Sequence, residues 1–194
     1  EVASTTYRVS KSNVFGLITA LGSETTGAFR FSKPGEALPS AQPSKAREVT
    51  REELDQRLSE RDTHPLAVWD GKVRMSIAGV QDKLMVYVDR PLEEGGRMFL
   101  VEPPLASTHI IKPEPGRAAT PHLVINEHFC MSLAARMGLP AAEVSIFRTP
   151  RPTLVVKRFD RSVLNGSTGP AVRRLHIIDA CQASDLPSTY KYER

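Results

Sequence analysis

The sequence contains no long hydrophobic run. None of its apolar stretches approaches the ~18 consecutive residues that a transmembrane helix requires, so a membrane span is excluded. The opening residues 1–8 (Glu-Val-Ala-Ser-Thr-Thr-Tyr-Arg) also lack the apolar core of a signal peptide. Because the first residue is not methionine, we expect the chain to be a fragment of a longer protein.

Cysteine is scarce: Cys130 and Cys181 are the only two in 194 residues, and they form no C-x-x-C motif. This usage is typical of a reduced compartment, so we predict a cytoplasmic protein whose thiols pack as small hydrophobic groups. The five histidines lack zinc spacing as well, since His122 and His128 are six positions apart. We therefore predict no metal site within this chain.

The chain is only mildly basic, with 26 lysines and arginines, 22 acidic residues and a formal net charge of +4. This balance favours contact with phosphates or with an acidic partner. The densest basic cluster, over 148–161, is interrupted by apolar residues. A dedicated nucleic-acid-binding protein would carry a denser basic stripe, so direct binding of DNA or RNA is not expected.

The first third of the chain predicts a small α/β segment. In chain order the pattern indicates a helix over 12–21 that ends at Gly22, a strand over 27–32 and a linker over 33–47. Thr50 and Glu53 have the spacing of a capping box, in which the hydroxyl accepts the Glu53 N–H and the glutamate reaches back. The charged helix that follows, to about Arg61, is expected on the surface with Leu54 and Leu58 on one stripe.

From Pro65 onwards the chain predicts a sheet of short strands. We expect strands over 66–69, 73–77, 84–88, 98–101, 108–112, 142–147, 153–159 and 173–178. Asp70-Gly71 has the composition of a hairpin turn, and Asp179 that of the N-cap of a short helix. Many short strands with one inward-facing helix indicate an α+β fold, in which an antiparallel sheet is covered by one main helix.

The main helix is predicted over 121–137, with Thr120 as its N-cap, Pro121 in its first turn and Gly138 after its end. Glu127 lies in its apolar stripe. The neighbours three, four and seven positions away are Leu123, Val124, Cys130, Met131 and Ala134. A carboxylate among such neighbours is expected to face inward.

An inward-facing Glu127 needs a cation, because removing one partner of a buried ion pair costs ~3–5 kcal/mol. The best candidate by position is Lys112, which shares a strand face with Ile110; alternatively, Glu127 lies at the rim of the stripe and reaches water. A small-residue loop over 76–83, a strand lysine and a helix glutamate are the parts that hold a nucleotide triphosphate in a kinase small lobe. The alternative is a β-hairpin with an exposed lysine and an unrelated glutamate.

Five segments in order resemble the HipA-type toxins, which are bacterial serine/threonine protein kinases of toxin–antitoxin modules. They are Ser-Ile-Ala-Gly-Val-Gln-Asp-Lys (76–83), Thr-His-Ile-Ile-Lys (108–112), Asn-Glu (126–127), Val-Lys-Arg-Phe-Asp-Arg (156–161) and Asp-Ala-Cys-Gln with Leu-Pro-Ser (179–188). The resemblance covers most of 73–193 and, more weakly, 12–31. Five motifs in order are specific, although any one alone would be weak.

The resemblance implies a role for each matching residue. The phosphate-contacting loop would comprise Ala78, Gly79, Val80, Gln81, Asp82 and Lys83. The hinge, whose backbone groups would reach the adenine, would comprise Lys157, Arg158 and Phe159, with Asp160 on the ribose side. Lys112 would hold the nucleotide phosphates and pair with Glu127, and Ser76 matches the serine that such kinases autophosphorylate to switch themselves off.

The resemblance also implies ATP and Mg²⁺ as cofactors. The chain stops before any catalytic-loop or metal-binding aspartate, so the Mg²⁺ ligands and all catalytic residues are expected in a missing large lobe. The implied partners are a DNA-binding antitoxin, through which alone DNA would be contacted, and a protein target such as an aminoacyl-tRNA synthetase. By itself, this fragment is expected to lack kinase activity and to bind nucleotide weakly at best.

One departure concerns the loop, which has Gly79 as its only glycine and does not form G-x-G-x-x-G. The implied domains are a partial N-terminal subdomain with a linker (1–62), a kinase-like small lobe ending at the hinge (63–161) and the start of a large lobe (162–194).

Two other functions remain open. One is a non-catalytic binding module that docks a protein or nucleic acid, and the other is a different nucleotide-binding enzyme, such as a ligase with a kinase-like lobe.

Overall fold

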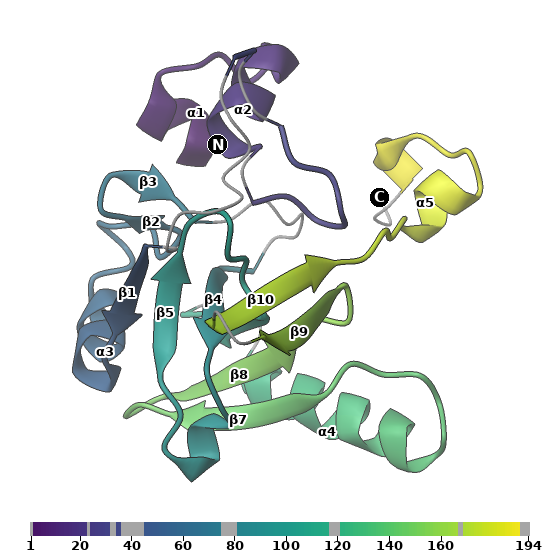
Figure 1. Cartoon of the computed structure of the whole chain (residues 1–194). Coiled ribbons are helices and arrows are strands. Elements are labelled where there is room, and N and C mark those ends of the chain that lie inside the picture. Colours follow the sequence, from purple (N-terminus) through teal and green to yellow (C-terminus); the bar gives the residue numbers. More distant parts are fainter. Residues whose placement is uncertain are drawn as a thin grey trace.

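The computed structural model describes residues 2–22, 24–31, 34–35, 45–74, 81–116, 121–166 and 169–190. The helices are α1 (Val2–Tyr7), α2 (Val14–Leu21), α3 (Arg51–Ser59), α4 (Leu123–Arg136) and α5 (Ala180–Ala183), with 3₁₀ turns η1 (Leu92–Glu94) and η2 (Ser188–Tyr190). The strands are β1 (Ala46–Val49), β2 (Val68–Trp69), β3 (Lys72–Val73), β4 (Leu84–Val88), β5 (Met98–Val101), β6 (His109–Pro113), β7 (Val144–Arg148), β8 (Pro152–Lys157), β9 (Arg161–Gly166) and β10 (Gly169–Arg174) (Figure 1).

The central element is a six-stranded sheet in the order β1-β5-β4-β6-β8-β7, and every strand pair in it is antiparallel. Two small hairpins, β2–β3 and β9–β10, accompany it. The β2–β3 hairpin turns at Asp70 (φ 51°) and Gly71 (φ 70°), as predicted. The α+β class predicted from the sequence is therefore confirmed.

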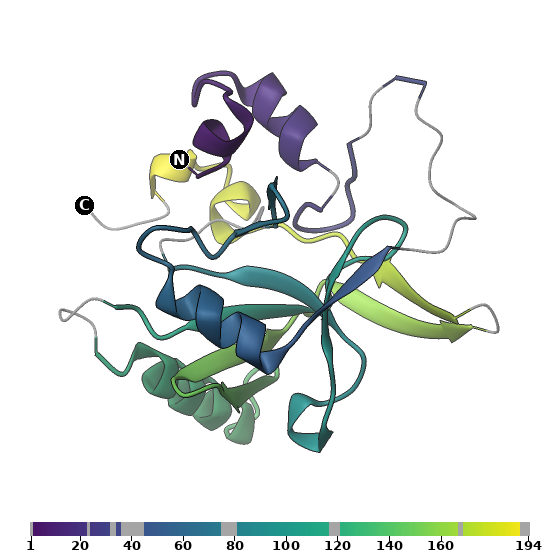
Figure 2. The same cartoon turned by 90° about the vertical axis from the view of Figure 1, so that its left-hand side faces the viewer.

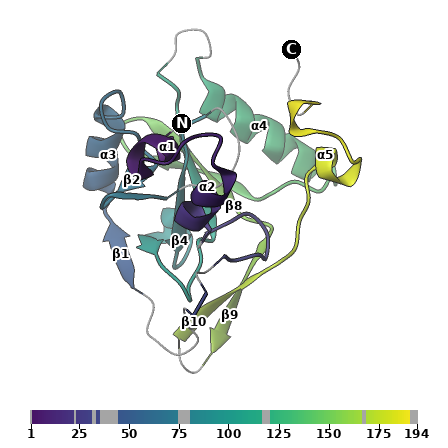
Figure 3. The ribbon, with the colours of Figure 1, turned by 90° about the horizontal axis from the view of Figure 1, so that it is seen from above.

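The two faces of this sheet are buried under different helices. Side chains alternate along β8, so Val155 joins one apolar cluster while Leu154 and Val156 join the other. The first cluster includes both leucines of α3, and the second includes Val124 of α4. The two helices lie on different sides of the molecule (Figures 1 and 3). The sequence predicted one covering helix, and α3, expected only on the surface, covers the other face.

The helices α1 and α2 lie together at one end of the sheet (Figures 1 and 2). Helix α2 begins after Asn13, whose side chain accepts the Gly16 N–H at 2.9 Å, and ends before Gly22, so the predicted helix is confirmed. The Tyr7 hydroxyl accepts the Val73 N–H at 2.9 Å and so joins α1 to β3. Among the described residues, no helix has the length and apolar character needed to span a membrane.

Helix α3 has half of the predicted capping box. The Thr50 hydroxyl accepts the Glu53 N–H at 3.1 Å, as expected. The Glu53 carboxylate does not reach back, because it pairs with Arg47 of β1. Leu54 and Leu58 lie on the predicted stripe and are fully buried.

Three predictions for irregular and extended segments are wrong in whole or in part. The strand expected over 27–32 is absent from the described part of that stretch, because the backbone of Gly27 (φ 74°) bonds to side chains instead of to a strand. Its N–H donates to the Asp160 carboxylate at 2.9 Å and its carbonyl accepts from Arg161 at 3.1 Å. Conversely, β1 begins within the last two residues of the predicted linker and is formed by pairing with β5. The strand expected over 173–178 ends at Arg174, within the unpredicted β9–β10 hairpin.

Helix α4 begins later than predicted and has a different cap. Its first residue is Leu123, and Thr120 lies outside the described residues. The Glu114 carboxylate accepts the N–H groups of Leu123 at 2.8 Å and Val124 at 3.0 Å. A carboxylate here satisfies two open donors and complements the helix dipole. The helix ends before Gly138 (φ 78°), as predicted.

Replacing Glu114 with alanine should lower the free energy of unfolding by about 1–2 kcal/mol, because two N–H groups at the start of α4 lose their acceptor. Urea unfolding of the chain measures this change. The exposed Glu94 provides the control, and Glu94→Ala should change stability by less than about 0.5 kcal/mol. Equal effects of the two substitutions would contradict the assigned cap.

Candidate nucleotide-binding site

The site predicted from the sequence centres on an ion pair between the sheet and α4. Lys112 of β6 lies on the face that carries Ile110, and its Nζ is 2.5 Å from Glu127 Oε1. The two side chains are 22% and 25% exposed, so the pair borders solvent without being fully exposed. The predicted pairing is confirmed, and the partial exposure of Glu127 places it at the rim of the apolar stripe, as the alternative expected.

A second lysine lies beside this pair. Lys83 immediately precedes β4, whose first residue, Leu84, is opposite Ile111 of β6. Lys83 is only 4% exposed. Its burial, and then the charge of Lys112, lower the pKa of Lys83, while Asp82 acts in the opposite direction. The effect of the Lys112 charge on the pKa of Lys83 shows that the two ammonium groups lie in the same region of the protein.

The predicted phosphate-contacting loop is described only at its end. Ala78, Gly79 and Val80 lie outside the described residues, as does the predicted modification site Ser76. The side-chain amide of Gln81 donates to the Pro113 carbonyl at 3.1 Å and joins the loop to the end of β6. A pocket of about 660 Å³ opens beside it, and its lining includes Gln81, Asp82, Pro113, Gly116, Leu123 and Arg151.

The predicted hinge residues lie where β8 leaves the sheet. The backbone N–H of Lys157 donates to the Glu143 carbonyl, and that of Arg158 to the Thr108 carbonyl, both at 2.9 Å. The Lys157 side chain pairs with the Glu143 carboxylate at 2.8 Å. Phe159 follows with its side chain 70% exposed. Contact of these residues with adenine stays a prediction.

Asp160, expected on the ribose side, has a buried carboxylate. It lies 2.7 Å from Arg158 Nη2 and 2.7 Å from Arg161 Nη1, and it accepts the Gly27 N–H. Burial by itself raises the pKa of Asp160, but the hydrogen bonds and charges of these partners outweigh it and hold the pKa below its usual value. The Asp160 carboxylate is therefore bonded to groups of the protein itself.

Sequence reasoning missed three participants in this buried group. Glu24 Oε1 accepts from Ser107 Oγ at 2.8 Å, and Glu24 Oε2 lies 3.0 Å from Arg174 Nη2. Burial is the main cause that lowers the pKa of Arg174, with Glu24 opposing it. Glu24, Ser107 and Arg174 lie too far apart in the sequence for a local pattern to connect them. The signal that the sequence did offer was the basic cluster over 148–161, which is interrupted by apolar residues.

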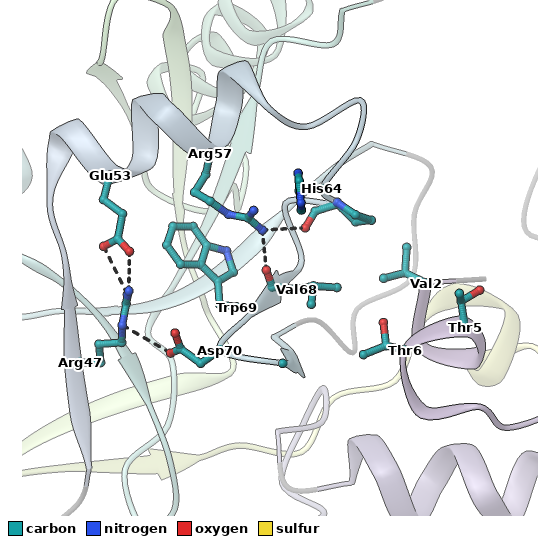
Figure 4. Close-up of a pocket in the computed structure, with 12 residues that line it drawn as sticks. Val2, Thr5, Thr6, Arg47, Glu53, Arg57, His64, Val68, Trp69 and Asp70 are labelled. Carbon is teal, nitrogen blue, oxygen red and sulfur yellow. Dashed lines mark hydrogen bonds and ion pairs between the residues drawn. The ribbon is translucent and has the colours of Figure 1, made fainter.

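A separate pocket of about 630 Å³ lies between α1, α3 and the β2–β3 hairpin (Figure 4). Trp69 forms part of its wall, with the guanidinium groups of Arg47 and Arg57 at 5.6 Å and 5.1 Å from the ring centroid. Arg47 pairs with Glu53 and Asp70, and Arg57 donates to two backbone carbonyls. None of the predicted nucleotide-binding residues that the structure describes lines this pocket, and both arginines are engaged.

His109 of β6 lies opposite Lys157 of β8, and its Nδ1 is 2.8 Å from the Thr108 hydroxyl. Burial, and then the charge of Lys157, lower its pKa to about 4, while Glu143 and Glu93 act in the opposite direction. The ring is therefore neutral in the folded protein at neutral pH.

Stability should fall as the pH is lowered from 7 to 5, because the unfolded chain takes up a proton on His109 near pH 6.5 and the folded chain does so only near pH 4. This residue alone should account for a loss of about 2 kcal/mol in the free energy of unfolding. Urea unfolding at each pH measures the loss. His109→Gln should flatten the dependence, and an unchanged slope would show that His109 does not cause it.

Comparison with known proteins shows which family this chain resembles. The family model described as HipA-like C-terminal domain matches residues 75–194. The Shewanella oneidensis protein named serine/threonine-protein kinase toxin HipA is 41% identical over 187 residues, covering 96% of this chain and 40% of that protein. The Sinorhizobium fredii protein named "Putative kinase Y4mE" is 36% identical over 192 residues, covering 95% of this chain and 42% of that protein.

A solved structure agrees with the sequence comparisons. The Shewanella oneidensis complex of HipA, HipB and operator DNA contains a chain that matches with a TM-score of 0.77 and 39% identity. The match covers 99% of this chain and 42% of that one. The chain thus spans about two fifths of the length of the relatives it matches. The order of motifs, the lysine–glutamate pair and these matches agree, and the chain belongs to the HipA-like family.

Proposed function

We propose that this chain is the nucleotide-binding part of a HipA-like serine/threonine protein kinase toxin, and that it holds the phosphates of ATP beneath α4. The observation that carries the proposal is the ion pair between Lys112 of β6 and Glu127 of α4, with the buried Lys83 near enough for the charge of Lys112 to lower its pKa. A lysine paired with a helix glutamate is the device with which kinases hold nucleotide phosphates. A second buried lysine strengthens the attraction for an anion.

Phosphoryl transfer depends mainly on positioning and charge neutralisation, and these residues would supply both. Glu127 would keep the Lys112 ammonium group directed at the phosphates. Lys83 would gain from the ligand, because a negative charge beside it raises its lowered pKa and stabilises its protonated form. At the other end of β8, Phe159 would lie beside the base. The backbone N–H groups of Lys157 and Arg158 already donate to carbonyls of the protein, so the phenyl ring would make this contact.

Mg²⁺ would enter this site on the ATP phosphates, whose charge it neutralises. Within the described ranges there is no group of three histidine, cysteine, aspartate or glutamate side chains that could hold a metal ion. The relatives are more than twice as long as the stretch matched here. We assign the metal-binding and base aspartates to the corresponding remainder of the parent protein.

The regulation and partners are also proposals. A neighbour of known structure was solved with HipB and operator DNA, which supports an antitoxin partner through which the parent would reach DNA. The family resemblance supports a protein target such as an aminoacyl-tRNA synthetase, and autophosphorylation at Ser76, which lies outside the described residues. The toxin–antitoxin relatives support a cytoplasmic location.

A non-catalytic docking function is the second candidate, and one observation favours it. Helix α4 carries a row of exposed apolar side chains four positions apart, namely Ile125, Phe129, Leu133 and Met137. Such a surface stripe is typical of a contact with another protein or domain. A measurement of nucleotide binding distinguishes the two candidate functions, because a docking module would not need Lys83 and Lys112 to bind phosphates.

Lys112→Met should weaken ATP binding to this chain at least tenfold, because the phosphates lose their main cation. Ligand-observed NMR titration suits the weak affinity expected of a part of the kinase. The control is Lys72→Met, which breaks the ion pair with Glu102 away from the site and should leave ATP affinity unchanged. Equal ATP affinity in all three proteins, or none in the unmodified chain, would refute the proposed function.

The parent protein should transfer phosphate from labelled ATP to protein, and this chain alone should not, because the base and metal ligands are assigned to the remainder of the parent. Autoradiography of the two proteins at equal concentration measures the difference. In the parent, Lys112→Met should reduce transfer by more than a hundredfold. Activity of this chain by itself would show that the catalytic residues have been misplaced.

A further inference from the structure

Six residues form a buried polar group at the end of β8, which we call the Glu24 cluster. Its members are Glu24, Ser107, Arg158, Asp160, Arg161 and Arg174. The side chains of Arg158 and Arg161 are each 1% exposed and that of Asp160 is 5% exposed. Charges buried this deeply remain stable only when they are paired and hydrogen-bonded.

The cluster lies on the same sheet face as the proposed phosphate site. Met85 of β4 is opposite Ile110 of β6, and the Met85 sulfur is 3.2 Å from Arg158 Nη1. Arg158 itself is joined to Thr108, four residues before Lys112 on β6. Four residues of strand span about 13 Å. The lysines and the cluster therefore lie toward opposite ends of one face, with Ile110 and Met85 between them.

The cluster holds both neighbours of Phe159. Arg158 donates to the Asp160 carboxylate through Nε at 2.9 Å and Nη2 at 2.7 Å, which makes a two-pronged contact across the intervening residue. The Asp160 carbonyl also accepts the Leu175 N–H at 3.0 Å. The backbone on each side of Phe159 is thus anchored, while the phenyl ring itself is 70% exposed.

Glu24 supplies the charge that holds this arrangement together. Its carboxylate lies 3.4 Å from Arg158 and 3.5 Å from Arg161, in addition to its contacts with Arg174 and Ser107. Within the cluster as defined, three guanidinium groups face two carboxylates. Without the Glu24 charge the three guanidinium groups would face the Asp160 carboxylate alone. Their mutual repulsion would then make the backbone on each side of Phe159 less firmly held.

We propose that Glu24 is a positioning residue for the base end of the nucleotide site, acting through Arg158 and Asp160 on Phe159. This inference rests on the proposed nucleotide-binding function. It assigns a task in ligand selection to a residue 134 positions before Arg158 in the sequence. A positioning role at the base end predicts a selective effect on ligands that carry a base.

The test compares ATP with inorganic tripolyphosphate, which has the phosphates and no base. Both dissociation constants are measured for the whole 194-residue chain by ligand-observed NMR. Glu24→Gln should weaken ATP binding about tenfold and leave tripolyphosphate binding within about twofold, because Lys83 and Lys112 are untouched. The matched control is Glu102→Gln, a carboxylate that also pairs with two cations, Lys72 and Arg74, and it should change neither constant.

Two further variants separate positioning from general destabilisation. Ser107→Ala removes one hydroxyl that bonds both Glu24 and Arg158, so it should shift the ATP constant in the same direction by a smaller factor even if Glu24→Gln folds poorly. Phe159→Ala should also weaken ATP alone. In that background Glu24→Gln should add no further loss, because residues that act through one another are not additive.

The outcomes distinguish the two proposals. If the unmodified chain binds ATP and Glu24→Gln weakens both ligands equally, or neither, the positioning role is refuted while nucleotide binding stands. Full additivity of Glu24→Gln and Phe159→Ala refutes it as well. If the unmodified chain binds neither ATP nor tripolyphosphate, the proposed function fails and the positioning role falls with it.

Discussion

The need to pair charge on the sheet face beneath α4 organises this part of the molecule. Lys112 and Glu127 join β6 to α4, and Arg158 and Asp160 join the end of β8 to the segment around Glu24. Losing one partner of the buried Arg158–Asp160 pair would cost several kcal/mol, and the partly exposed Lys112–Glu127 pair adds a weaker restriction on where α4 can lie. Both the helix and the N-terminal segment are thereby tied to one surface.

The Glu24 cluster and the Lys112–Glu127 pair differ in how far their side chains are exposed to solvent. In the Glu24 cluster the arginines bond to carboxylates, to the Ser107 hydroxyl and to backbone carbonyls, and their side chains are at most 7% exposed. At the other end, the side chains of Lys112 and Glu127 are 22% and 25% exposed, so this pair borders solvent.

Several features of the fold and the site could be predicted from sequence because their causes are local or periodic. Asp70-Gly71 forms the expected turn, since both residues tolerate positive φ. Asp179 is the N-cap of α5, as expected, and its side chain accepts the Gln182 N–H. The pairing of Glu127 with Lys112 followed from the helical and strand periods, because a carboxylate in an apolar stripe requires a cation on the facing strand.

The sequence by itself determined which side chains share a face, where turns and caps can form, and which buried charge needs a partner. Only the tertiary structure decided that Glu114 caps α4 instead of a residue next to the helix, that β1 pairs with β5, and that Glu24 joins the end of β8. The reason is physical. These contacts join segments that the fold brings together, and neither a helical nor a strand period records a partner in another segment, whether it lies nine residues away, as Glu114 does from Leu123, or 134 residues away, as Glu24 does from Arg158.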